Sequence, residues 1–307
     1  MDTPRNSEEV EFKTLDGLTL RGTLYPAAGS EPGPAIVMTP GFNLTRRTLM
    51  PKIAVVFQGN GVTALAYDPR TLGSSDGVPR NNIHPGQQVS DYHDAVTFLK
   101  SDPRVDQNKI AIWGMSFSGA VALSAAALDP RVRLIIAVCP LTTWELPENR
   151  SRGVMSKAMQ DRESQITGNK PLYLPMINLK GENPTGFGAG SGAQELHLVQ
   201  RSLQELPDFE INTTIQTYYN IRTWNPFHTL RLLSQTPTIL ITPEEDRISL
   251  AEKQKDLIYE KLTGPRFMHV VPGKGHMDIF DGESFGSTMQ MQVDFIRRHL
   301  SGLWGVD

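Results

Sequence analysis

The stretch IAIWGMSFSGAVALSAAAL, residues 110–128, joins an apolar run to alanine-rich sequence through a corner of small residues. The apolar run predicts a buried strand, and the alanine-rich part predicts a helix. Ser116 lies on the corner, two residues after Gly114 and two before Ser118. A serine on so sharp a turn holds its hydroxyl clear of the backbone, provided that these two neighbours are small. We therefore interpret Ser116 as a nucleophile, the alternative being a helix N-cap.

The rest of the chain repeats this change from strand to helix. A hairpin is expected around Asp16-Gly17, a pair that tolerates positive φ, and six further short apolar runs predict buried strands. These strands are expected at 35–39, 62–67, 109–113, 133–138, 237–242 and 267–271, and helices at 48–58, 86–101, 116–128, 249–261 and 284–302. Alternating strands and helices predict an α/β fold with a mostly parallel eight-stranded sheet flanked by helices.

The alternation stops between strands six and seven. Residues 141–235 contain no strand of comparable quality and include the glycine-rich run at 181–194. Because a structureless loop of this length is improbable, we predict a mainly helical lid inserted into a core formed by residues 1–140 and 236–307. Its aromatic residues are expected to form an apolar cover over the site: Trp144, Tyr173, Phe187, Tyr218, Tyr219 and Trp224.

A serine nucleophile needs a histidine base, and the histidine needs a carboxylate that fixes its tautomer. On this architecture both should follow the serine, each in a loop after a strand. Asp246 lies four residues beyond the strand at 237–242, and His276 lies five residues beyond the next. The other six histidines lie in strands, in or near helices, or in the insertion. Three carboxylates compete with Asp246 for the acidic position: Glu244, Glu245 and Asp278.

The developing oxyanion needs backbone donors. We expect the N–H of Phe117, directly after Ser116, and the N–H of Phe42, beside Gly41 in the loop after the strand at 35–39. Cys139 ends an apolar strand and has no adjacent base, so we interpret it as a buried packing residue. No metal-ligand spacing and no phosphate-binding glycine motif is present, and no cofactor or metal is expected.

Composition narrows the class of protein. The chain has 307 residues, a formal net charge of −3 and no long basic run, so a nucleic-acid partner is not expected. A single cysteine excludes an internal disulfide, and no apolar segment reaches membrane-spanning length. The first residues lack a basic start followed by an apolar core. These features predict a cytoplasmic protein that does not bind a membrane.

Five segments together resemble the α/β-hydrolase superfamily: TPGFN (39–43), YDPRTLGSSDG (67–77), GMSFSG (114–119), EED (244–246) and GKGH (273–276). The resemblance implies the α/β-hydrolase fold. It also implies that Asp68, Arg70, Gly73 and Ser75 brace the turn below the site. The sequence departs from the family pattern where Pro40 replaces a common histidine and where Ser118 replaces the usual second glycine.

Within the superfamily, the elbow, the YDPR turn and the WNPF stretch (224–227) are similar to those of fungal polyketide transferases and hydrolases of secondary metabolism, including relatives in AK-toxin clusters. This resemblance implies a polyketide-type acyl substrate, held as a thioester on a carrier protein or polyketide synthase and transferred to water or an alcohol. Two alternatives remain open. The pocket can serve cyclisation or dehydration with His276 as base, or the protein can be a small-molecule receptor with a vestigial triad.

Overall fold

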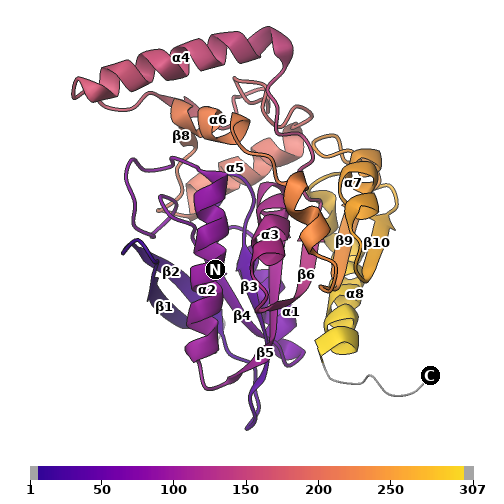
Figure 1. Ribbon diagram of the computed structural model, residues 1–307. Helices are drawn as coiled ribbons and strands as arrows, with labels where there is room; N and C mark the ends of the chain where they lie inside the picture. Colours follow the sequence, from indigo (N-terminus) through magenta and orange to yellow (C-terminus); the bar gives the residue numbers. More distant parts are fainter. Residues whose placement is uncertain (1–5, 301–307) are drawn as a thin grey trace.

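The computed structural model describes residues 6–300 and contains an eight-stranded sheet in the order β1-β2-β4-β3-β5-β6-β9-β10 (Figure 1). Its strands are β1 (Glu8–Lys13), β2 (Thr19–Tyr25), β3 (Gly33–Thr39), β4 (Thr63–Tyr67), β5 (Val105–Met115), β6 (Val132–Val138), β9 (Thr238–Pro243) and β10 (Arg266–Val271). β1 and β2 form the expected antiparallel hairpin, β2 pairs antiparallel with β4, and the other neighbours are parallel. The mostly parallel eight-stranded sheet predicted from the sequence is therefore confirmed.

Helices cover both faces of the sheet. They are α1 (Met50–Gly59), α2 (Pro85–Ser101), α3 (Ser116–Leu128), α7 (Ala251–Leu257) and α8 (Gly282–Leu300), with 3-10 turns η2 (Tyr259–Lys261) and η3 (Asp278–Phe280). The helix expected at 249–261 is interrupted, because Ile258 leaves the helical conformation and is fully buried. The last two residues of the helix expected at 284–302 lie outside the described residues.

Alternation along β5 divides the core into two layers. Ile110 and Ile112 pack into the cluster that includes residues of α2 and α3. Ala111 and Trp113 pack into the other cluster, which includes residues of α1 and α8. All four side chains are fully buried, so β5 is fixed from both faces and the corner that follows it is held in a fixed place.

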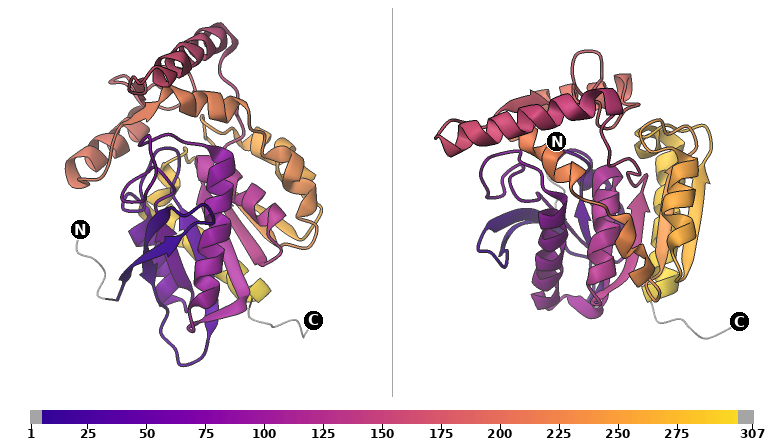
Figure 2. Two further views of the ribbon diagram at one scale, coloured as in Figure 1. Left: turned by 60° about the vertical axis from the view of Figure 1, so that its left-hand side comes forward. Right: turned by 45° about the horizontal axis from the view of Figure 1, so that its top comes forward.

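The chain between β6 and β9 contains α4 (Glu148–Ile166), α5 (Ala193–Glu205), α6 (Ile215–Arg222) and the 3-10 turn η1 (Phe227–Leu232). Figures 1 and 2 show α4, α5 and α6 at one end of the sheet, with α4 farthest from the strands, whereas η1 packs beside α3. It also contains a short antiparallel pair, β7 (Tyr173–Pro175) and β8 (Asn212–Thr214). The sequence did not predict this pair, because three residues are too few to show an alternating pattern. No helix among residues 6–300 combines the length and the apolar character needed to cross a bilayer.

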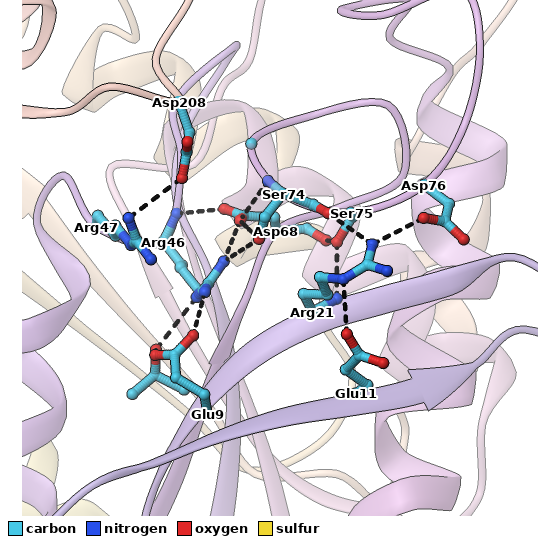
Figure 3. A network of polar contacts seen from close by, with 12 residues as sticks. Glu9, Glu11, Arg21, Arg46, Arg47, Asp68, Ser74, Ser75, Asp76 and Asp208 are labelled. Carbon is cyan, nitrogen blue, oxygen red and sulfur yellow. Dashed lines mark hydrogen bonds and ion pairs between the residues drawn. The ribbon is translucent and has the colours of Figure 1, made fainter.

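A buried ion pair fastens the loop after β3 to the loop after β4. The Arg46 guanidinium bonds to Asp68, and both side chains are 2% exposed. Asp68 also accepts the Arg46 N–H at 2.7 Å, and its carbonyl accepts the Ser75 hydroxyl at 2.6 Å. Gly73 has φ +49° and leaves no space for a Cβ beside Asp68. Figure 3 shows this network around Arg46 and Asp68.

The partner of Asp68 is Arg46 and not Arg70. The Arg70 guanidinium instead pairs with the buried Asp91 of α2 at 2.7 Å and with Asp16 of the hairpin turn at 2.8 Å. Both arginines thus hold turns in place, and neither reaches the predicted site.

Candidate active site

Ser116 begins α3 directly after β5, with a φ of +53°. This left-handed conformation is strained for a residue with a side chain, which is what a sharp strand-to-helix corner requires. Glycine at position 114 is necessary, because an added Cβ would lie 2.3 Å from the Ser118 carbonyl oxygen. Ser118 is buried and fits as the small residue on the other side. The corner has the geometry that the sequence predicts.

His276 and Asp246 lie beside this serine. The His276 Nε2 is 2.9 Å from the Ser116 Oγ, and its Nδ1 is 2.7 Å from the Asp246 Oδ2. Asp246 is held by its other oxygen, which accepts hydrogen bonds from the N–H groups of Ile248 and Ser249 at 2.9 and 2.8 Å. The corner between β5 and α3 and the loops after β9 and β10 therefore bring together three residues separated by up to 160 positions.

The carboxylate determines the protonation of the ring. Since Asp246 as a carboxylate only accepts, the proton belongs on His276 Nδ1, and Nε2 is left to accept from the serine hydroxyl. Burial opposes a charge on His276, yet the neighbouring Asp246 carboxylate raises its pKa above the ordinary value. Burial also raises the pKa of the Cys139 thiol, so that thiol is neutral at pH 7. We therefore assign the stabilising charge to Asp246.

Cys139 directly follows β6, has φ +39° and is completely buried. Its Sγ lies 3.9 Å from both the Nε2 and the carbonyl oxygen of His276. With Asp246 and His276 it forms the one group of three possible metal ligands within residues 6–300. The nitrogen and oxygen atoms of that group already hydrogen-bond to one another and to Ser116, which fits a proton-transfer chain better than a metal centre.

None of the three competing carboxylates bonds to His276, and two of them bond to other groups. Glu244 accepts from the Gly273 N–H at 2.8 Å, and Asp278 accepts from the Gly275 N–H at 2.8 Å and from Gln194. Glu245 is exposed and makes no side-chain hydrogen bond in the described part of the chain. Asp246 is thus the carboxylate on the histidine, as the spacing from the strand predicts.

Both residues predicted to supply oxyanion donors line the cavity that contains Ser116. Phe117 is in the first turn of α3, where N–H groups have no intrahelical partner. No acceptor for the Phe42 N–H occurs within residues 6–300. A Cβ on Gly41 would be 3.6 Å from the Ser116 Cβ, so the loop after β3 passes directly beside the serine. β3 and β5 are neighbours in the sheet, which explains why their loops meet there.

An apolar cavity of about 100 Å³ opens at Ser116 and His276. Its walls come from both the core and the insertion, and they include Met115, Phe117, Met176, Phe187, Leu198 and Val199. Flexible methionine and rigid aromatic side chains suit an extended apolar group. Sequence reasoning did not find Met176, Leu198 or Val199. Leu198 and Val199 could have been found from the sequence, because they lie on the apolar, buried side of an amphipathic helix, α5.

The insertion's aromatic residues have two different environments. Phe187 lines the apolar cavity. Trp144 lies behind the cavity wall, with ring centroids 5.0 Å from Phe117 and 4.6 Å from Trp224, and Tyr218 packs against Phe187 at 6.3 Å. Of these four rings, Phe187 forms part of the wall, and the other three pack behind it.

A second, polar cavity of about 250 Å³ meets the first at Glu195, Ile248 and His276. Its other polar side chains are Gln194, Glu245, Arg247 and Asp278. Three carboxylates face one guanidinium, and Arg247 has no ion pair within the described residues, so the cavity is net negative. Two cavities of opposite character thus reach the same imidazole.

The chain is similar to an α/β-hydrolase family described as X-Pro dipeptidyl-peptidase (S15 family), whose model matches residues 16–176. A thiohydrolase of Eupenicillium brefeldianum is 47% identical over 291 residues, covering 94% of each chain. The polyketide transferase af380 of Aspergillus fumigatus is 43% identical, covering 96% of this chain and 99% of its own. Among solved structures, the α/β hydrolase GrgF of Penicillium sp. sh18 has a TM-score of 0.86 and 41% identity, covering 96% of this chain and 99% of that one.

Proposed function

Because the chain belongs to the S15 family of α/β hydrolases, among enzymes of the hydrolase and acyltransferase type, we propose that it is a serine-dependent acyl-transfer enzyme for apolar, polyketide-type acyl groups. The observation that carries the proposal is the hydrogen-bonded chain from Ser116 through His276 to Asp246 at the end of an apolar cavity. The relatives' names, thiohydrolase and polyketide transferase, favour a thioester as acyl donor.

In the first step, the Ser116 Oγ attacks the acyl carbonyl carbon while its proton passes to His276 Nε2. Asp246 stabilises the imidazolium that forms, and the carbonyl oxygen becomes an oxyanion bound by the N–H groups of Phe42 and Phe117. Collapse of this intermediate breaks the C–S bond. The proton on Nε2 passes to the departing sulfur, and the acyl group remains on the serine as an ester.

In the second step, the hydroxyl of water or of an alcohol gives its proton to His276 Nε2 and attacks the ester carbonyl. Collapse returns the proton to Ser116 Oγ and releases an acid or a new ester. We propose that the acyl chain lies in the apolar cavity and that the polar cavity takes the leaving thiol and then the acceptor, since both must reach Nε2. The excess of carboxylates there favours a neutral hydroxylic acceptor over an anionic one.

The insertion is proposed to act as a lid, since Phe187, Leu198 and Val199 close the apolar cavity from that side. Presentation of the acyl group on a carrier protein or polyketide synthase, and a cytoplasmic location, are kept as predictions from the sequence. Excluding water from the acyl-enzyme would favour transfer over hydrolysis.

The test is thiol release from a medium-chain acyl thioester by the wild-type protein, Ser116→Ala and His276→Ala, with products analysed in the presence of added alcohols. We expect both variants to lose turnover by at least about 10³-fold while remaining folded. Retained turnover in Ser116→Ala, with loss in His276→Ala, would instead support cyclisation or dehydration with His276 as base. Tight saturable binding with negligible turnover of the wild type would support the receptor alternative.

A further inference from the structure

Asn43 directly follows the proposed oxyanion donor Phe42 in the loop after β3. It has φ +55° and is 1% exposed. Asparagine tolerates this left-handed conformation better than most residues, yet burying its amide costs free energy unless each polar atom has a partner. The partners of the amide therefore show what the loop is fastened to.

The Asn43 amide bonds to two other segments of the chain. Its Nδ2 donates to the Glu210 carbonyl oxygen of the insertion at 3.0 Å and lies 3.6 Å from the Met176 Sδ. Its Oδ1 accepts from the Asn81 Nδ2 at 3.0 Å. Asn81 belongs to the loop after β4, so one side chain joins the oxyanion loop to both of its neighbours.

Asn81 extends the connection into β8 and α6 of the insertion. It is 5% exposed with φ +51°, and its carbonyl oxygen accepts from the Thr213 hydroxyl at 2.7 Å and from the Thr214 N–H at 3.2 Å. Thr213 in turn bonds to the Thr217 hydroxyl at 2.8 Å. We name the following five residues the Asn43 bridge: Asn43, Asn81, Thr213, Thr214 and Thr217. Such a satisfied buried network makes the positions of its members depend on one another.

The ring of Phe42 is held by the same insertion. Its centroid lies 5.2 Å from that of Phe187 and 6.4 Å from that of Tyr218. Polar and aromatic contacts with the insertion thus flank the peptide group that carries the Phe42 N–H. The ring also lies 5.5 Å from that of Phe117 in the core, so core and insertion both contact the residue that carries this N–H.

We propose that Asn43 is a positioning residue that sets the Phe42 N–H for the oxyanion by fastening its loop to the insertion. The proposal rests on the proposed function, in which Phe42 is an oxyanion donor. It makes the insertion a part of the catalytic geometry in addition to a wall of the cavity. Donors of this kind act only when their place is fixed before the charge develops.

The decisive variant is Asn43→Asp, which has nearly the same shape, tolerates positive φ and still accepts from Asn81. It cannot donate to the Glu210 carbonyl, so the loop loses its bond to the insertion. Removing an oxyanion donor outright costs about 10²–10³ in kcat, and we expect misplacing one to cost at least about tenfold, with KM nearly unchanged. Thr213→Val, which removes a hydroxyl that donates to the Asn81 carbonyl oxygen, should give a smaller loss in kcat.

Two ligands separate positioning from general destabilisation. An alkyl boronic acid forms a tetrahedral adduct on serine that needs the oxyanion donors, whereas an alkyl amide of equal length occupies only the apolar cavity. For Asn43→Asp we expect the affinity for the boronic acid to fall by the same factor as kcat, with amide affinity unchanged. The matched control is Gln292→Glu in α8, a buried amide whose Oε1 accepts from Trp113 and whose Nε2 donates to Thr288. The melting temperature of the Gln292→Glu protein should fall, while its affinity for the boronic acid should not change.

Unchanged boronic acid affinity in both bridge variants would overturn the proposal, and so would an equal loss for both ligands. If Asn43→Asp does not fold, Thr213→Val alone decides between these results. A wild-type protein that forms no boronate adduct on Ser116 would instead refute the proposed function, and the two failures are thereby distinguished.

Discussion

Gly114→Ala adds a single methyl group to the end of β5 and tests the tightest contact of the corner. The new Cβ would lie 2.3 Å from the Ser118 carbonyl oxygen, 2.7 Å from the carbon of that carbonyl and 3.0 Å from the Ala122 Cβ. Because Cβ atoms almost never approach other atoms within 3.0 Å, β5 and the first turn of α3 must separate by about 0.7 Å. Ser116 lies between the two and must move with them.

The magnitude follows from this displacement. Overpacking of a buried contact costs about 1–3 kcal/mol in the free energy of unfolding. A misplacement near 1 Å costs up to about 10²-fold in rate, because the Ser116 Oγ must stay within hydrogen-bond distance of His276 Nε2. We expect kcat to fall by about 30- to 100-fold while the fold is retained.

The assay combines thermal unfolding with the rate of acylation by an acyl thioester. The control is Gly153→Ala inside α4, where an added Cβ meets no atom within 4 Å. It should stabilise the protein by up to about 1 kcal/mol, because alanine favours a helix over glycine, and leave the acylation rate unchanged. A Gly114→Ala protein with wild-type acylation would refute the reasoning.

Three further predictions concern the residues around His276. Because the pKa of His276 is raised, kcat/KM should rise with pH along a limb centred above pH 6.5. The stability that protonation of His276 contributes should be complete below pH 6.5 and lost as the pH rises through the raised pKa. A limb below pH 6 in the pH–rate profile would contradict this prediction. Asp246→Asn should reduce kcat by about 10⁴-fold without unfolding the protein, since an amide donating to Nδ1 fixes the wrong tautomer; circular dichroism and steady-state kinetics check both parts. Cys139, buried and with a raised pKa, should react with a disulfide reagent at pH 8 only as fast as the protein opens, and stoichiometric reaction within seconds would show that the thiol is accessible.

The parts of the fold and site that the sequence predicts well are those determined by local patterns. Buried parallel strands are short apolar runs, so β3, β4, β5 and β9 were found within a few residues of their bounds. The positions of Ser116, Asp246 and His276 follow from counting residues beyond strand ends, because the carboxyl ends of parallel strands share one edge of the sheet.

Features that depend on distant pairings were not found. The ion pair of Asp68 with Arg46, which is 22 positions earlier in the chain, was not predicted from the sequence. The bond between Asn43 and Asn81 spans 38 positions and has no motif. Both pairings depend on the packing of two loops, which a single sequence does not encode as a local pattern.

The most direct test of the account is intact-protein mass spectrometry within the first turnover of a medium-chain acyl thioester. We expect a mass increase equal to one acyl group on the wild-type protein and none on Ser116→Ala. Glu205→Gln, at the exposed end of α5, should give the wild-type result. Consumption of the thioester by the wild-type protein and by Ser116→Ala alike, with no adduct on either, would contradict covalent catalysis by Ser116.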